Sequence, residues 1–151
     1  MISTGAVLGV DIEGIDLAGI LDTETINAIK AAWAKHLVLR FCGQNLRDED
    51  LLRFSRYFGP LDQAPVNSYG TTWAPENPEI NAISNILDYE GLRIGGLDDG
   101  EAQWHADMTY VETPVHACAL YAIEVPKTAG NTGFANMIAA YDALSVQIKE
   151  R

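Results

Sequence analysis

A histidine and an aspartate stand two residues apart in the segment His105-Ala106-Asp107. In an extended backbone the side chains of residues i and i+2 project to the same side, so both groups could reach one metal ion. An imidazole and a carboxylate are two of the three ligands in the facial triad that holds non-haem Fe(II). That triad leaves metal positions open, as binding of a bidentate keto acid together with O2 requires.

The pair also has a simpler interpretation. A histidine hydrogen-bonded to a nearby carboxylate at the end of a loop would show the same spacing. The chain has three histidines, and the other two, His36 and His116, are interpreted as structural residues at the ends of strands. The residues around His105 and Asp107 therefore decide between a metal site and an ordinary loop histidine.

The composition indicates one globular domain. The 151 residues, 48% of them hydrophobic, are enough to form a core. The net charge of -11 repels phosphates and anionic lipids, so neither nucleic acid nor a membrane is an expected partner. The sequence shows no secretory signal and no apolar run near the roughly 20 residues of a membrane span, so a cytoplasmic location is expected. Cys42 and Cys118 are too few for a disulfide framework, and we interpret both as small core residues.

The hydrophobic pattern predicts a mixed α+β domain. Apolar residues at helical spacing predict helices, and short apolar runs between turn residues predict strands. The expected helices cover residues 23–35, 48–58 and 137–149, and the expected strands cover residues 36–41, 80–87, 117–125 and 132–135, after an extended segment at residues 5–17. Residues 60–79 and 88–103 are expected to be long loops, which often line functional sites.

An ordered set of motifs surrounds the His-x-Asp pair. The motifs are Trp104-His105-Ala106-Asp107, Thr113-Pro114, Gly130-Asn131-Thr132 and Ala140-Tyr141-Asp142-Ala143-Leu144. With them, residues 101–144 resemble the taurine and 2,4-dichlorophenoxyacetate dioxygenase family of Fe(II)/2-oxoglutarate enzymes. The N-terminal part fits the same family through residues 14–17, 36–41 and 56–59.

The resemblance implies a fold, cofactors and a reaction. The fold would be the N-terminal portion of a double-stranded β-helix (a jelly roll of the clavaminate synthase type) with flanking helices. His105 and Asp107 would bind Fe(II), and the Thr132 hydroxyl would donate a hydrogen bond to a carboxylate of 2-oxoglutarate. With O2, the enzyme would hydroxylate a small organic substrate and release succinate and CO2. An ordinary strand or turn threonine is the alternative for Thr132.

The substrate positions depart from those of the taurine enzyme. Its substrate-binding His, Tyr and Asn correspond here to Ala64, Asn67 and Glu101, so taurine itself is not expected as substrate. A carboxylate at Glu101, close to the iron, would repel a sulfonate. Trp104 could form a wall of the substrate pocket or could serve in core packing. The acidic cluster that includes Glu101 could also be a solvated loop.

Two further family positions, the second histidine ligand and the arginine that pairs with 2-oxoglutarate, have no match in this sequence. We therefore expect a truncated single domain, residues 1–151, that binds Fe(II) weakly and does not turn over. One alternative is a non-catalytic module that binds a partner or forms a homo-oligomer through exposed sheet edges. Another is a cupin-like site in which His105, Asp107 and His116 bind a different divalent ion.

Overall fold

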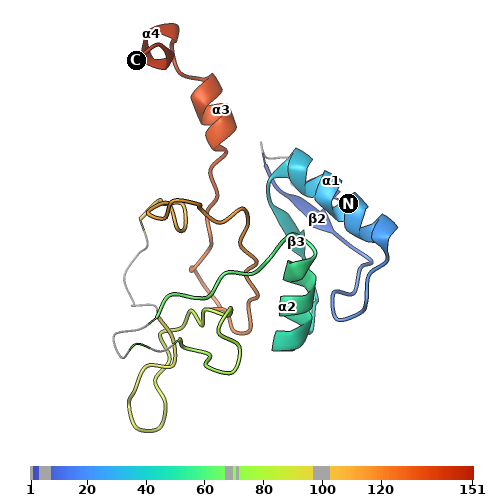
Figure 1. The fold of residues 1–151 in the computed structure, drawn as a ribbon, viewed down its shortest axis with the longest axis vertical. Coiled ribbons are helices and arrows are strands. Elements are labelled where there is room, and N and C mark those ends of the chain that lie inside the picture. The colour runs from blue at the N-terminus through green and yellow to red at the C-terminus, as the bar shows by residue number, and fades with distance from the viewer. Residues whose placement is uncertain (1, 4–7, 67–69, 71, 97–102) are drawn as a thin grey trace. The chain divides into compact units, whose positions relative to one another are not determined.

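A computed structural model describes residues 2–3, 8–66, 70, 72–96 and 103–151 of the chain (Figure 1). The chain divides into two compact units. The first unit combines Met1–Asn45 with Ala122–Arg151, and the second is Leu46–Tyr121. Helices and strands both occur, so the mixed class predicted from the sequence is confirmed.

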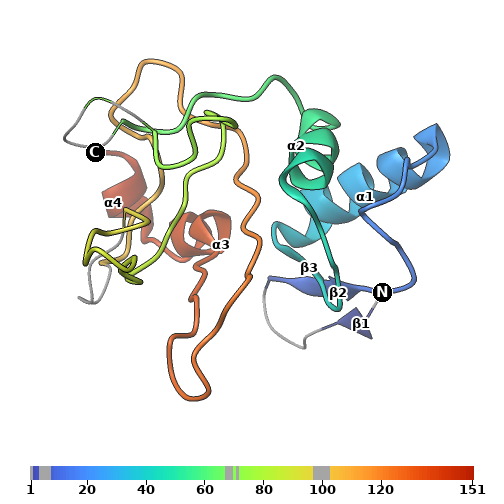
Figure 2. The same cartoon turned by 90° about the horizontal axis from the view of Figure 1, so that it is seen from below.

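A three-stranded sheet forms the centre of the first unit. β2 (Val10–Ile12) lies between β1 (Ile2–Ser3) and β3 (Leu39–Phe41), and it pairs antiparallel with β1 and parallel with β3. Parallel neighbours need a crossover connection, which here contains α1 (Thr23–His36) (Figure 2). The extended segment predicted at residues 5–17 contains β2, and the strand predicted at residues 36–41 contains β3, although both strands are short.

Helix α1 begins and ends through local interactions. The Asp22 carboxylate accepts a hydrogen bond of 2.7 Å from the backbone N–H of Thr25 and so caps the first turn. Leu37 ends the helix with a φ of 65°, in the left-handed region. Its N–H donates to the Trp33 carbonyl, and its own carbonyl accepts from the Trp33 indole N–H. Trp33 thus satisfies both the N–H and the carbonyl of Leu37 at the end of α1.

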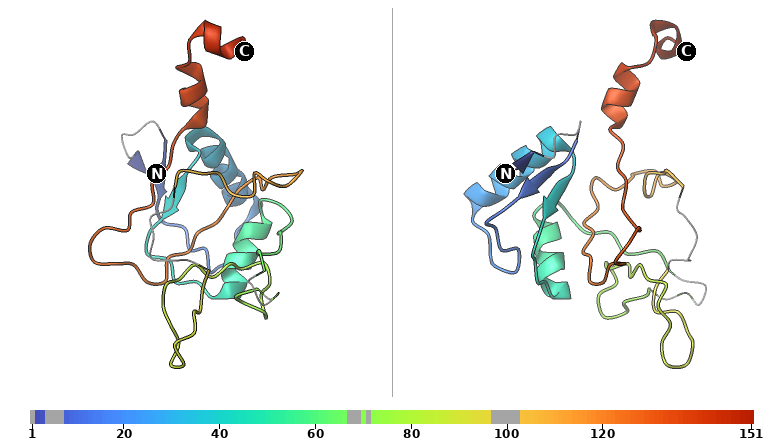
Figure 3. Two further views of the ribbon diagram at one scale, coloured as in Figure 1. Left: turned by 90° about the vertical axis from the view of Figure 1, so that its left-hand side faces the viewer. Right: turned by 180° about the vertical axis from the view of Figure 1, so that it is seen from behind.

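The first unit has a small hydrophobic core between α1 and the sheet. Val10, Ile12 and Ala32 form a buried cluster, against which Leu39 and Phe41 pack. Ile29, one turn before Ala32, is also buried, as the helical spacing predicts. Packing of α1 on β3 therefore stabilises both elements (Figure 3).

The C-terminal part of the first unit contains two short helices where one was predicted. They are α3 (Met137–Asp142) and α4 (Val146–Lys149), and neither buries a side chain. The Asn136 side chain caps α3 by accepting from the Ala139 N–H at 3.0 Å. The expected single helix over residues 137–149 is therefore wrong. Without an apolar face packed on a partner, little holds a short helix together across the break at residues 143–145.

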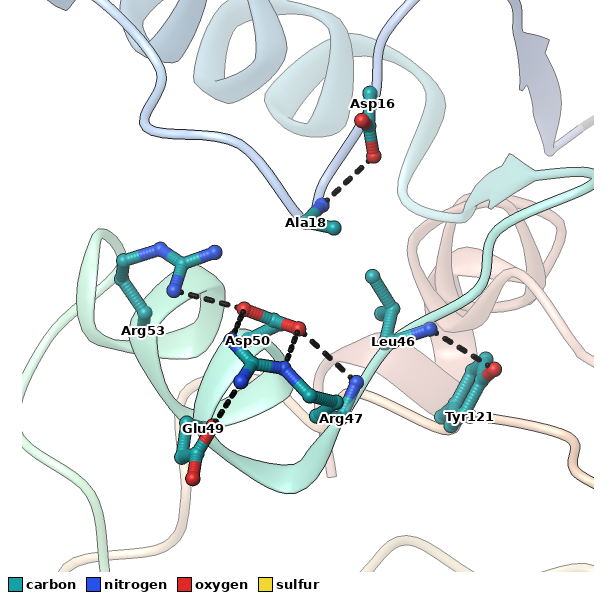
Figure 4. Close-up of polar contacts among 8 residues, drawn as sticks. All are labelled: Asp16, Ala18, Leu46, Arg47, Glu49, Asp50, Arg53 and Tyr121. Atoms are coloured by element: carbon teal, nitrogen blue, oxygen red, sulfur yellow. Dashed lines mark hydrogen bonds and ion pairs between the residues drawn. The ribbon is translucent and has the colours of Figure 1, made fainter.

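In the described residues of the second unit, the helix is α2 (Asp48–Arg56), close to the predicted span. Asp50 lies in the first turn of this helix, and its charged side chain is buried (Figure 4). Asp50 accepts from the backbone N–H and the guanidinium of Arg47, and from the Arg53 guanidinium at 2.9 Å. The helix buries Leu52 and Phe54.

Three predicted strands are not formed. Residues 117–125 and 132–135 are irregular, and residues 80–87 take part only in an isolated bridge between Leu87 and Arg93. A strand needs a neighbouring strand for its N–H and C=O groups, and the described residues supply no ladder there. Residues 82–96 instead form a hairpin through scattered hydrogen bonds, such as that from the Gly96 N–H to the Ala82 carbonyl. The double-stranded β-helix stays a prediction.

Among the described residues, no helix has the length and apolar character needed to cross a membrane.

Candidate metal centre

The His-x-Asp pair lies at the start of a turn. Residues 105 and 106 belong to no helix or strand, and residues 107–110 form the turn. Within it, the Val111 N–H donates to the Met108 carbonyl at 3.3 Å, and Met108 has a positive φ of 55°. The segment is not a strand, but it still places Asp107 at the start of a turn with its carboxylate free to face back toward residue 105.

The two side chains meet. His105 Nε2 lies 3.1 Å from Asp107 Oδ1, and the side chains are 62% and 57% exposed. Two ligand atoms about 2.1 Å from one ion and at a right angle to each other lie about 3 Å apart. The separation of this nitrogen and this oxygen therefore fits two neighbouring positions on one divalent metal. The expected convergence of His105 and Asp107 is present in the structure.

The other ring nitrogen of His105 has a backbone partner. Nδ1 lies 2.6 Å from the carbonyl oxygen of Gln103. A carbonyl can only accept, so Nδ1 carries the proton and Nε2 is left to face Asp107. The same contact, followed by the charge of Asp107, raises the pKa of His105 above its ordinary value. Metal ligands of this type commonly have their second nitrogen held in this way, which fixes the ring orientation.

The remaining oxygen of the Asp107 carboxylate contacts a cysteine. Cys118 Sγ lies 3.4 Å from Asp107 Oδ2. Partial burial of the sulfur and the neighbouring carboxylate raise the pKa of the thiol. Both Cys118 and Cys42 are exposed residues, so their interpretation as core residues is wrong. Among the described residues no strand pairs with the apolar segment around Cys118, and sequence spacing gave no sign of its contact with Asp107.

Of the other predicted site residues, the structure describes Trp104 and Thr132. Trp104 is 73% exposed. Thr132 belongs to the first unit, where it is exposed and lies outside any helix or strand. Asn67 and Glu101 lie outside the described residues. Within the part of the chain that the structure describes, no three His, Cys, Asp or Glu residues form a group that could hold a metal ion, so the arrangement with His116 as third ligand is not formed.

The sequence matches a known family over almost its whole length. The model of the family described as "Taurine catabolism dioxygenase TauD, TfdA family" matches residues 3–151. The chain therefore belongs to the TauD/TfdA family of dioxygenases. Membership of this family implies Fe(II) and 2-oxoglutarate as cofactors, and the imidazole and carboxylate of the His105–Asp107 pair are suitable ligands for the metal.

Several characterised relatives are similar to this chain. An (S)-phenoxypropionate/alpha-ketoglutarate-dioxygenase of Sphingobium herbicidovorans is 36% identical over 97% of this chain and 47% of its own length. A pentalenolactone F synthase of Streptomyces avermitilis is 34% identical over 97% of this chain and 48% of its own length. An alpha-ketoglutarate-dependent 2,4-dichlorophenoxyacetate dioxygenase of Cupriavidus pinatubonensis is 30% identical over 88% of this chain and 48% of its own length. The chain thus spans about half the length of these relatives.

Proposed function

We propose that these residues supply the first part of the active site of an Fe(II)- and 2-oxoglutarate-dependent dioxygenase. The complete enzyme would use O2 to hydroxylate a small organic substrate and release succinate and CO2. The observation that carries the proposal is the 3.1 Å approach of His105 Nε2 to Asp107 Oδ1 in a member of this family. The fixed Nδ1 of His105 supports it, because the free nitrogen is then the one that faces Asp107.

Each residue has a role in the proposal. His105 and Asp107 hold Fe(II), which when bound provides the open positions for 2-oxoglutarate and O2. Thr132 donates its hydroxyl hydrogen to a carboxylate of 2-oxoglutarate. Trp104, Asn67 and Glu101 are the proposed substrate-binding residues. The protein's part in the reaction is to hold the ligands, orient the substrate C–H bond and exclude water.

We also propose that the 151 residues by themselves bind Fe(II) weakly and do not turn over. The support is that the described residues bring two metal-binding side chains together and no third. The jelly roll would form when the segments predicted as strands, residues 80–87, 117–125 and 132–135, pair with neighbouring strands. The chain spans about half the length of its relatives.

An anaerobic titration with Fe(II) or Co(II) tests the metal site. His105→Ala and Asp107→Ala each remove a ligand, so we expect both to lower metal affinity beyond the about 10- to 100-fold that loss of an outer partner costs. His116→Ala is the matched control and should bind like the unaltered chain. If Asp107→Ala bound metal normally, the proposed site would be wrong. Steady succinate production by the unaltered chain would contradict its proposed inactivity.

A second candidate is a module that binds a partner or a second copy of itself. Exposed large apolar side chains favour it, among them Leu120, Ile123 and Val125 in the irregular segment that follows the metal site. Such side chains are common at interfaces between proteins. A module of this kind would form a defined oligomer that takes up no metal.

A further inference from the structure

Asp107 uses its two carboxylate oxygens for different partners. Oδ1 faces His105 Nε2 at 3.1 Å, and Oδ2 faces Cys118 Sγ at 3.4 Å. All three residues belong to the same compact unit. Cys118 comes eleven residues after Asp107 in the chain, so the chain beyond the 107–110 turn comes back to the carboxylate.

This division of the carboxylate has a consequence for a metal ligand. A carboxylate can bind a metal through one oxygen or through both, and its plane can rotate about the bond that joins it to the side chain. A hydrogen bond to Oδ2 limits that rotation and leaves Oδ1 as the oxygen beside the imidazole. Outer partners of this kind orient ligating carboxylates in metal sites generally.

The geometry favours a donor role over a ligand role for the cysteine. The sulfur lies beside Oδ2, whereas the nitrogen of His105 lies beside Oδ1. In the described part of the chain, His105, Asp107 and Cys118 do not make up a group of three that could hold one ion. A thiol S–H is a weak donor, so its effect on the carboxylate should be modest but measurable.

We propose that Cys118 is a positioning residue of the metal site, which donates its S–H to Asp107 Oδ2 and directs Oδ1 toward the ion. The inference rests on the proposed function of His105 and Asp107 as metal ligands. Cys118 touches neither substrate nor metal in this arrangement. It acts on the metal through the orientation of Asp107.

Titration of the reduced 151-residue chain with Co(II) under argon tests the inference. Cys118→Ala removes the donor, and we expect Co(II) affinity to fall about 10-fold, the lower end of the range for an outer partner. Cys118→Ser keeps a donor and should recover most of that loss, because a hydroxyl is the stronger hydrogen-bond donor. Cys42→Ala removes the other exposed thiol, in the other unit, and should bind like the unaltered chain. Circular dichroism compares the helix content of the variants.

Three results would overturn the inference. One is Co(II) affinity of Cys118→Ala equal to that of the unaltered chain. Another is a thiolate-to-cobalt charge-transfer band that disappears in Cys118→Ser, since it would make the sulfur a ligand. The third is a serine variant no better than the alanine variant, since it would indicate a packing effect. Asp107→Ala distinguishes failure of the proposed metal site from failure of the proposed role of Cys118. Normal Co(II) binding by Asp107→Ala would reject the metal site itself.

Discussion

Asp50 is a buried carboxylate whose charge is balanced by two arginines. Hydrogen bonds from Arg47, with a further bond from Arg53, lower its pKa from 3.8 to about 2 (Figure 4). The folded form thus binds a proton less readily than the unfolded form does. Because the folded pKa is the lower one, the stabilisation is fully present well above pH 3.8 and is lost as the pH falls through that value toward about 2.

The first prediction is a loss of stability over the pH range in which Asp50 takes up its proton. Urea denaturation of the unaltered chain should show a midpoint that falls between about pH 5 and about pH 2.5. Asp50→Asn cannot form the ion pairs, so it should be less stable at neutral pH and show a smaller change over the same range. Glu13→Gln is a control, since no ion pair of Glu13 is seen in the described residues. Equal pH dependence in Asp50→Asn and the control would contradict the prediction.

At the residue scale, local spacing was enough to find His105 and Asp107 but not their partners. His105 and Asp107 are two positions apart in sequence, so local backbone geometry alone can bring their side chains together. The contact from Cys118 depends on how the chain returns after the turn at residues 107–110, which no local pattern encodes. Asp50 was likewise missed as a buried residue, because the helical pattern of α2 placed it among the polar positions.

Among the elements, α1 and α2 were predicted to within a few residues. Their ends depend on caps and turns within a few positions in sequence, such as Asp22 for α1. The strands expected at residues 80–87 and 117–125 need partner strands distant in sequence, and the described residues supply no strand that pairs with them. Helices were therefore more predictable than strands here because their hydrogen bonds are local.

The second prediction tests the core between α1 and the sheet. Ile29 is 3% exposed, so Ile29→Ala should lower the free energy of unfolding by about 2–5 kcal/mol. Ile20 is 89% exposed, and Ile20→Ala should change it by less than about 0.5 kcal/mol. Chemical denaturation followed by circular dichroism of the helices gives both values. Similar effects of the two substitutions would mean that α1 does not pack as described.

The third prediction concerns the hairpin at residues 82–96. A Cβ at Gly95 would lie 2.6 Å from the backbone nitrogen of Ser84 and 2.9 Å from the Ala82 carbonyl oxygen. Backbone atoms cannot move aside as a flexible side chain can, so Gly95→Ala should open the hairpin. Trypsin should then cut faster after the exposed Arg93. Gly19→Ala, whose Cβ would meet only the Asp16 carbonyl oxygen at 3.5 Å, is the control and should leave cleavage at Arg93 unchanged.

For the molecule as a whole, apolar side chains are distributed unusually. Among the described residues, seven hydrophobic side chains are buried, whereas twenty large ones are exposed. Scattered exposed apolar residues are normal, but a chain of this size with so small a core has much apolar surface left for other contacts. The net charge of -11 opposes self-association at low salt, and salt screens that repulsion.

The fourth prediction follows from this balance. The chain should bind the dye ANS, and its hydrodynamic size should grow with protein concentration and with salt. Sedimentation velocity at two salt concentrations measures the growth. Leu120→Lys combined with Ile123→Lys reduces the exposed apolar surface and should reduce both signals. A monodisperse monomer that binds no ANS at high salt would contradict the prediction.

The two exposed cysteines also provide positions for labelling the molecule. The chain contains two cysteines, and one lies in each compact unit: Cys42 in the first and Cys118 in the second. Each unit thus has its own attachment point for a spectroscopic label, without any engineered residue. A pair of spin labels would report the distance between the units. In the Cys118→Ser variant, a single label on Cys42 would reveal whether metal bound at His105 and Asp107 changes the motion of the unit that does not contain them.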